Sequence, residues 1–414
     1  MYSKFNINEN LIKNVNEQES LIRDKYSYID EICEYNQLKV LKAFIDSKVS
    51  ESHFAESTGY GFNDIGRDKI EEVYSRVFCT EDALVRQQIV SGTHAISIAL
   101  FSILRPGDNF LSITGLPYDT LSATIGLNNQ PSSLKEYNIG FNFVDLINND
   151  FDFSKIKESI NSNTKLIFIQ RSRGYTDRNS ISIDKIQKVI SFLKNINKDL
   201  IVLIDNCYTE FVFKNEPTEF GADIMCGSLI KNPGGGLALS GGYIVGKKKL
   251  INKCADKLTA PGIGKEVGVN FNQNRNVLRG LYIAPQIVSN ALKLVLLYSK
   301  VLNQHNINTI PMYNDDISDI VIAIKLGSKE AIEDFCNIIQ STSPVDSFLK
   351  PTSSDMPGYD SKVIMAAGCF VSGASIELSC DAPIREPFYA YLQGGLSYSQ
   401  GKLALMMFLN KYLN

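Results

Sequence analysis

The sequence contains few side chains of the kinds that bind metals. It has three histidines, and its eight cysteines include no C-x-x-C pair, so the usual spacing of metal ligands is missing. We therefore expect neither a structural nor a catalytic metal. We also expect most of the cysteines to be reduced thiols in the protein core.

Long apolar runs and clusters of one charge are missing too. No uncharged apolar stretch reaches the roughly 20 residues that a membrane helix requires. The first residues mix charge with asparagine, whereas a secretory signal would need an unbroken apolar centre. The net charge is −3 and no long run of lysine and arginine occurs, which argues against DNA or RNA as a partner. We expect a cytoplasmic protein that binds small molecules and neither nucleic acid nor membrane.

The length and composition favour a folded chain with more than one unit. Hydrophobic residues make up 44% of the 414 residues and charged residues 21%, so a large core can form. Single cores stop growing at roughly 250 to 300 residues, so a second unit is expected. We predict an N-terminal helical segment over residues 1–60, a large domain over 61–300 and a small C-terminal domain over 301–414.

A mostly parallel β-sheet is the prediction for the large domain. Short runs of apolar and β-branched residues alternate with helical patterns between Gly92 and Gly246. Such alternation is typical of parallel strands with helices on both faces of the sheet, which is the α/β class. The predicted strands are NFLSIT (109–114), KLIFIQ (165–170), LIVLID (200–205), DIMCG (223–227) and GGYIVG (241–246), and the predicted helices include 93–104 and 183–196.

Helical patterns dominate the segments that precede and follow the predicted sheet in the sequence. Apolar residues at three- and four-residue intervals predict one or two helices within 11–50, and a further helix started by Asp68 or a nearby residue. A long helical run covers about 265–301, and we expect Pro285 to break it. The C-terminal unit is predicted to be α+β, with a strand in 316–328, a helix in 329–340 and strand-like alternation in 373–380.

Asp205 and Lys231 follow two successive predicted strands. Asp205 ends LIVLID, at the edge of the sheet where the ligands of open α/β proteins gather. Lys231 follows the next predicted strand and precedes Asn-Pro and three glycines, which allow the backbone to pass close to a bound group. An isolated aspartate often only caps a helix, and an isolated lysine is often a solvated charge. Here the two lie on neighbouring strands.

A turn of small residues lies upstream of both. Ser91, Gly92 and Thr93 stand directly ahead of an apolar helical pattern. A helix N-terminus offers free N–H groups and a positive dipole to a phosphate, although serine or threonine there is also an ordinary N-cap. A phosphate turn, an aspartate and a lysine are together what pyridoxal phosphate requires. The lysine amine forms a Schiff base, and the carboxylate keeps the pyridine nitrogen protonated so that the ring can act as an electron sink.

Seven motifs run in order through the chain: GYGFNDIGRDKIEEVYSRVF, QIVSGTHAI, GLPYDTL, QRSRGY, IDNCY, GSLIKNPGGGLALSGGYIVG and REPFYAYLQGGL. The order of phosphate turn, aspartate and lysine resembles that of fold-type I pyridoxal-phosphate enzymes. More narrowly, the chain from about Tyr60 to the C-terminus resembles the methionine gamma-lyase-like family, often labelled aluminium resistance protein, of Cys/Met metabolism. Asp177 and Thr209 depart from its pattern, in which tryptophan and glycine stand.

The resemblance implies the fold-type I transferase architecture and a set of ligands for pyridoxal 5'-phosphate. The phosphate would be held by the amides of Gly92 and Thr93 and by the hydroxyls of Ser91 and Ser228. Tyr118 would stack on the pyridine ring, because aromatic rings gain from offset stacking. The implied catalytic residues are Lys231, Tyr118 and Asp205.

The resemblance also suggests residues that bind the substrate or reach a second subunit. Arg385, in the small domain, could hold an α-carboxylate through two parallel hydrogen bonds, and Arg173 is the alternative. Tyr60 and Arg67 lie in a segment that related enzymes extend to a neighbour's phosphate. This implies a homodimer or a homotetramer.

The implied activity is a pyridoxal-phosphate-dependent lyase that acts on a sulfur-containing or similarly substituted amino acid. Lys231 would remove the α-proton, and a leaving group on the β or γ carbon would then be expelled. The sequence leaves β- and γ-elimination equally open. Aminotransfer, γ-replacement, aldol cleavage and a non-catalytic cofactor-binding protein remain as alternatives, because one fold can host many reactions.

Overall fold

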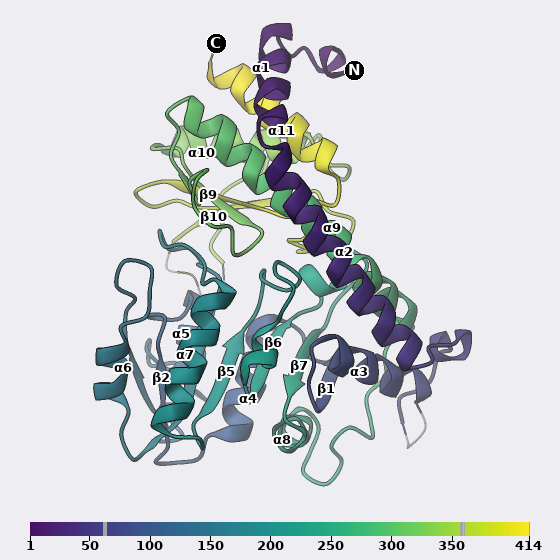
Figure 1. Cartoon of the computed structure of the whole chain (residues 1–414), viewed down its shortest axis with the longest axis vertical. Coiled ribbons are helices and arrows are strands. Elements are labelled where there is room, and N and C mark those ends of the chain that lie inside the picture. The colour runs from purple at the N-terminus through teal and green to yellow at the C-terminus, as the bar shows by residue number, and fades with distance from the viewer. Residues whose placement is uncertain (61–63, 357–358, 360, 414) are drawn as a thin grey trace.

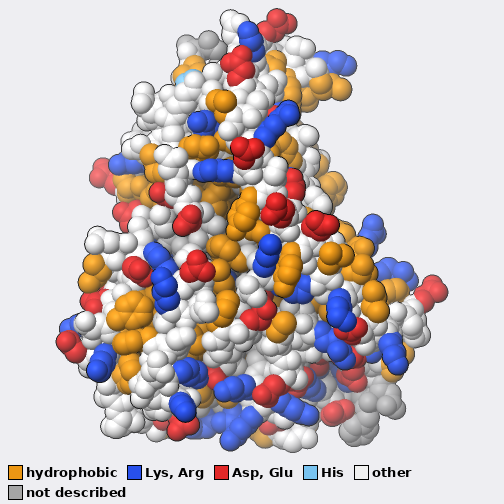
Figure 2. All heavy atoms as spheres, viewed as in Figure 1, with side chains coloured by type: hydrophobic (Ala, Val, Ile, Leu, Met, Phe, Trp, Pro, Cys, Tyr) orange, Lys and Arg blue, Asp and Glu red, His pale blue; other side chains and the backbone are white. Residues whose placement is uncertain are grey.

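The computed structural model describes residues 1–60, 64–356, 359 and 361–413. Residues 61–63, which belong to the first motif and begin the predicted large domain, lie outside the described residues. Figure 1 shows two sheet-containing parts stacked along the long axis of the molecule, with long helices running between them. On the face shown in Figure 2, acidic and basic side chains are interspersed.

The larger sheet has seven strands in the described part of the chain, in the order β1-β7-β6-β5-β4-β2-β3. The pairs from β3 to β6 are parallel, whereas β7 is antiparallel to both β1 and β6. The prediction of a mostly parallel sheet is confirmed. The strands are β1 (Asp82–Arg86), β2 (Asn109–Ser112), β3 (Gly140–Phe143), β4 (Thr164–Gln170), β5 (Ile201–Asp205), β6 (Ile224–Ser228) and β7 (Gly242–Gly246).

Helices cover both faces of this sheet, as predicted. Side chains alternate along β5, so that Leu203 joins the core on one face while Val202 and Ile204 join the core on the other. Both faces are therefore apolar, which explains the continuous hydrophobic runs. One face packs against α4 (Gly92–Ile103), α5 (Asp119–Ile125) and α8 (Lys248–Leu258), and the other against α3 (Ile65–Val77), α6 (Phe153–Ser159) and α7 (Ile183–Ile196).

The smaller sheet is antiparallel and belongs to the C-terminal part of the chain, which confirms the predicted α+β unit. Its described strands have the order β10-β11-β12-β9-β8. They are β8 (Thr309–Ile310), β9 (Val321–Lys325), β10 (Val363–Ala366), β11 (Ser379–Pro383) and β12 (Tyr389–Gln393), accompanied by α10 (Lys329–Ser341) and α11 (Tyr398–Tyr412).

Two long helices join the parts. Figure 1 shows α2 (Arg23–Asp46) running alongside α9 (Asn274–Gln304), and the Tyr26 hydroxyl and Gln37 amide donate hydrogen bonds to carbonyls of α9. The predicted break at Pro285 is wrong, because α9 continues through this residue. Pro285 is buried, so packing on the helix outweighs the loss of one backbone hydrogen bond. The remaining helices are α1 (Glu9–Ser20) and the 3₁₀ turns η1 (Tyr2–Phe5), η2 (Glu51–Phe54), η3 (Pro217–Phe220) and η4 (Asn232–Gly234).

Helix α9 is long and apolar enough, by length and composition alone, to cross a membrane. However, 72% of its most apolar window is buried inside the protein. Its apolar character therefore matches its place in the core.

Two local predictions need correction or refinement, and a third is confirmed. Asp64, rather than Asp68, caps α3 by accepting a hydrogen bond from the amide of Arg67 at 2.9 Å, while Asp68 lies in the first turn. The alternation in 373–380 forms a strand only from Ser379, because the residues before it make turns around Gly373. All eight cysteines are free thiols and six of them are buried, as expected.

Candidate active site

Lys231 lies directly after β6, at the start of the turn η4. Its side chain is partly buried, and its Nζ lies 3.9 Å from the centre of the Tyr208 ring. Burial alone would lower the pKa of Lys231, but the acidic groups around it outweigh burial and raise the pKa well above its usual range. These groups are Cys207, Tyr208, Asp205 and Tyr118.

Asp205 ends β5, the strand beside β6, and is buried. Its carboxylate accepts a hydrogen bond from the amide of Cys207 at 3.1 Å. Burial raises the pKa of Asp205, and the charge of Lys231 opposes this rise. The structure therefore brings the two predicted residues together at one edge of the sheet, within electrostatic range of each other.

The glycines after Lys231 allow a close crossing of two backbones. A Cβ on Gly280 of α9 would overlap the carbonyl oxygen of Gly234, and one on Gly235 would overlap the carbonyl oxygen of Gly280. Gly235 also has φ 54°, a conformation that other residues resist. The turn that carries Lys231 is thus pressed against the long helix.

The predicted phosphate turn forms the N-terminus of α4. Ser91 is its N-cap, and the Ser91 hydroxyl accepts a hydrogen bond from the amide of His94 at 3.1 Å. A Cβ on Gly92 would lie 3.1 Å from the Cys207 sulfur and 3.6 Å from Cβ of Ser228. The structure thus places Ser228, at the end of β6, beside the first turn of α4.

Tyr118 reaches the same turn from the start of α5. Its hydroxyl lies 3.1 Å from the Thr93 hydroxyl, and its amide donates to the side chain of Gln170. Burial raises the pKa of Tyr118, and the nearby Asp205 raises it further. Thr93, Tyr118, Asp205 and Lys231 therefore form one group.

The two candidate arginines differ in how strongly other groups engage them. Arg173 is buried, donates to the carbonyl of Ile310, and has its Nη2 3.7 Å from the Asp319 carboxylate. Arg385 is exposed and donates at 3.4 Å to a backbone carbonyl, that of Tyr175. Both arginines act on the pKa of Tyr391, so both lie near the small sheet.

Tyr60 and Arg67 differ in exposure, and neither is linked to Lys231 in the described part of the chain. Tyr60 is 89% exposed and pairs through its backbone with Val267. Arg67 is buried, and its guanidinium donates to the carbonyl of Gly59. Among the described residues, neither shares a hydrogen bond or ion pair with Lys231.

Several residues of the site were not assigned from the sequence. Cys207 and Tyr208 follow Asp205 within the motif IDNCY, so proximity along the chain could have indicated them. Asp381 and Tyr359 come from the small domain, yet both respond electrostatically to Lys231. No local pattern marks them, because only the packing of the two parts brings them near the lysine.

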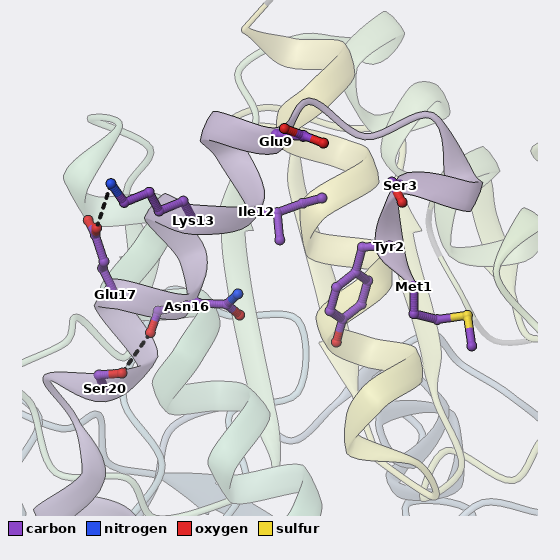
Figure 3. Close-up of a pocket in the computed structure, with 9 residues that line it drawn as sticks. All are labelled: Met1, Tyr2, Ser3, Glu9, Ile12, Lys13, Asn16, Glu17 and Ser20. Atoms are coloured by element: carbon purple, nitrogen blue, oxygen red, sulfur yellow. Dashed lines mark hydrogen bonds and ion pairs between the residues drawn. The ribbon is translucent and has the colours of Figure 1, made fainter.

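A separate cavity of about 510 Å³ opens at the N-terminus. Figure 3 shows that its lining residues come from η1 and α1, including Tyr2, Ile12 and Asn16. None of the predicted site residues lines this cavity.

The seven-stranded sheet, with a lysine and an aspartate at the ends of adjacent strands, defines the class of fold-type I enzymes. The pyridoxal-5'-phosphate-dependent protein YhfS of Escherichia coli has this fold, with a TM-score of 0.64 at 16% identity, covering 93% of this chain and 97% of that one. The chain belongs to the methionine gamma-lyase family, whose model matches residues 10–413. The resemblance recognised from the motifs is therefore confirmed.

Two relatives are similar to this chain over nearly its whole length. The protein YnbB of Bacillus subtilis (strain 168), described as uncharacterized, is 47% identical over 98% of this chain and 97% of its own. A carbon-sulfur lyase involved in aluminum resistance, from Clostridium novyi NT, is 44% identical with a TM-score of 0.94. The match covers 99% of this chain and 97% of that structure.

Proposed function

We propose that this protein is a pyridoxal-phosphate-dependent carbon–sulfur lyase that eliminates a sulfur-containing group from the β or γ carbon of an amino acid. The observation that carries the proposal is the pairing of Lys231 with Asp205 between the N-terminus of α4 and Tyr118. The name of the Clostridium novyi relative supports this reaction class.

The residues present fit the cofactor. Amides in the first turn of α4 and the hydroxyls of Ser91 and Ser228 suit a phosphate, and the lack of a side chain at Gly92 lets this turn lie close to Ser228. The Asp205 carboxylate suits a protonated ring nitrogen, and the Tyr118 ring suits the face of a pyridine. When bound, pyridoxal phosphate supplies an electron sink for the charge left by removal of the α-proton.

Lys231 has two tasks in this proposal. Its amine would hold the cofactor, and in the substrate complex Nζ would accept the proton from the substrate's α-carbon. Tyr208 lies against Nζ and Tyr118 lies nearby, so both limit the positions that the amine can take. The proton held on Nζ can then pass to the leaving group.

Arg385 is our first choice for the substrate's α-carboxylate. Its guanidinium is exposed and has a single weak acceptor, whereas Arg173 is already engaged by Ile310 and Asp319. Arg173 remains the alternative, because its Nε is buried without a partner among the described residues.

Other reactions on the same fold are the second candidates. Aminotransfer, γ-replacement and aldol cleavage all need the same lysine and aspartate, and a protein that only binds the cofactor would also keep the phosphate turn. The presence of both Lys231 and Asp205, within electrostatic range of each other, favours turnover over binding alone.

A substrate panel tests the proposal. Purified protein with cofactor would be incubated with cystathionine, cysteine, methionine and an O-acylhomoserine, and ammonia and keto acid would be measured together. We expect equal amounts of both products. Half-transamination or retro-aldol products alone would overturn elimination, and a new amino acid in place of ammonia would indicate replacement.

A further inference from the structure

Asp381 brings a carboxylate from the small domain toward the lysine. It lies on β11, opposite Tyr391 of β12, and its Oδ2 accepts a hydrogen bond from Gln393 at 3.1 Å. Tyr175, on the loop after β4, is its second hydrogen-bond donor. A carboxylate has about four lone-pair sites, and these two donors, among the residues that the structure describes, use two of them.

Tyrosine rings line the space around this carboxylate. The Tyr175 ring lies 5.0 Å from that of Tyr391 and 5.6 Å from that of Tyr359. Gly174 places this loop against Tyr118, since a Cβ on Gly174 would lie 3.7 Å from Cβ of Tyr118. We call Asp381 and the tyrosines around it, Tyr175, Tyr359 and Tyr391, the wall. This wall therefore adjoins Tyr118, the residue proposed to cover the cofactor ring.

The wall also adjoins Lys231. Tyr208, whose ring lies under Nζ of Lys231, packs into the same cluster as Tyr175 and Tyr391. Burial raises the pKa of Asp381, and the charged Lys231 is one of the groups that oppose this rise. Asp381 thus lies within electrostatic range of the atom that would take the α-proton.

A carboxylate at this position repels the α-carboxylate of an amino-acid substrate and attracts a cationic group on its side chain. Asp381 would repel the α-carboxylate of the substrate, whereas Arg385 and Arg173, which both lower the pKa of Tyr391, would attract it. A cationic group on the substrate side chain would instead find a carboxylate that can accept its hydrogen bond. A neutral thioether side chain, such as that of methionine, would leave the carboxylate facing an apolar group, which is costly.

We propose that Asp381 selects substrates whose sulfur substituent ends in an ammonium group, so that it sets the specificity of this site. The inference rests on the proposed function, because it places the substrate's α-carbon at Lys231. Neutral thioethers should therefore be poorer ligands than substrates that carry this ammonium group.

Two ligands of equal size test the proposal. S-(2-aminoethyl)-L-cysteine and S-propyl-L-cysteine differ only in an ammonium in place of a methyl group. Their dissociation constants would be measured by calorimetry on cofactor-loaded protein with wild-type Asp381, with Asp381→Asn and with Asp177→Asn, each in a Lys231→Ala background that lacks the proton acceptor and so does not consume the ligands. Asp177→Asn is the matched control, because it removes the same charge. Asp177 is an exposed carboxylate that raises the pKa of Tyr389 and of Tyr391.

The protein with wild-type Asp381 should bind the aminoethyl ligand at least about tenfold more tightly, as expected for a charged hydrogen bond. Asp381→Asn should bring the two constants to within about twofold of each other, whereas Asp177→Asn should keep the preference. Tyr175→Phe, which removes a competing donor to Asp381, should keep or increase it. Equal binding of the two ligands by the protein with wild-type Asp381 would overturn the proposal whether or not the variants fold.

Two further outcomes separate this inference from the reaction itself. If Asp177→Asn removed the preference as completely as Asp381→Asn, general surface charge would explain it and the proposal would fail. If no ligand released ammonia but the binding preference held, the lyase reaction would be wrong while the assignment of Asp381 would stand.

Discussion

The Nζ atom of Lys231 lies 3.9 Å from the centre of the Tyr208 ring, on the face where an aromatic ring attracts a cation. Asp205 and the other acidic groups around it favour the charged amine as well. The lysine that we propose as the nucleophile thus has surroundings that favour its charged form.

The rate of cofactor attachment should consequently depend on pH. Only the neutral amine can attack, and a pKa raised above its usual range leaves a small neutral fraction at every pH below it. The attachment rate of saturating pyridoxal phosphate, followed by absorbance, should rise about tenfold per pH unit between about pH 7 and about pH 9. Asp205→Asn removes a group that raises this pKa, so it should attach the cofactor faster than wild type at pH 8. A flat pH profile would contradict this prediction.

Lys231 should be the residue that binds the cofactor covalently. Borohydride reduction followed by peptide mapping should place the pyridoxyl group on Lys231, and Lys231→Ala should bind the cofactor only reversibly. Loss of the proton acceptor should reduce turnover by about 100- to 10,000-fold. A pyridoxyl group on another lysine would refute the assignment.

Asp205→Asn should keep the cofactor but lose most turnover. A neutral amide cannot hold the ring-nitrogen proton as a carboxylate does, so kcat should fall by about 100-fold or more. Steady-state kinetics beside a cofactor titration would separate the two effects. Near-normal rates would reduce Asp205 to a residue that only organises the turn at Cys207.

Arg385→Lys should raise KM about tenfold or more without changing the cofactor spectrum, because a lysine cannot make the two parallel hydrogen bonds of a guanidinium. The increase should be similar for all amino-acid substrates, since each carries the α-carboxylate. An unchanged KM would transfer the role to Arg173, whose own substitution the same assay can test.

A second subunit should complete the phosphate site. Tyr60 is 89% exposed in the single chain, so Tyr60→Ala should leave the fold intact while weakening cofactor binding if the residue serves a neighbour. Mixing this variant with Lys231→Ala should restore some activity, because one hybrid site would have both residues. Activity that never exceeds that of the separate variants, under conditions where subunits exchange, would count against a shared site.

Local sequence patterns predicted the elements that have one continuous buried face or are buried on both faces. Helix α7 matches its predicted range because Ile186, Val189, Ile190 and Leu193 repeat at helical spacing against one sheet face. Strand β5 was equally clear, since burial on both faces makes it continuously apolar. Strand β3, by contrast, is exposed at the sheet edge and carries no such signal.

Long-range packing explains what could not be predicted. The rule that proline ends a helix failed at Pro285, because α2 and the core enclose that part of α9. Other site residues could be proposed because each lies near the end of a strand of the large sheet or at the start of a helix beside it. They are Ser91, Gly92, Asp205, Ser228 and Lys231. Asp381 could not, because it lies in a separate sheet and reaches the lysine only through tertiary structure.

The close contact between Gly234 and Gly280 couples α9 to the turn that carries Lys231. From this contact the helix runs to Tyr298, whose hydroxyl donates to the carbonyl of Gly401 in α11 of the small domain. A single rigid rod of 31 residues therefore connects the catalytic turn to the domain that carries Asp381 and Arg385. Tilting the small domain would tilt the rod, and a methyl group added at Gly280 would displace Lys231 although it touches neither cofactor nor substrate.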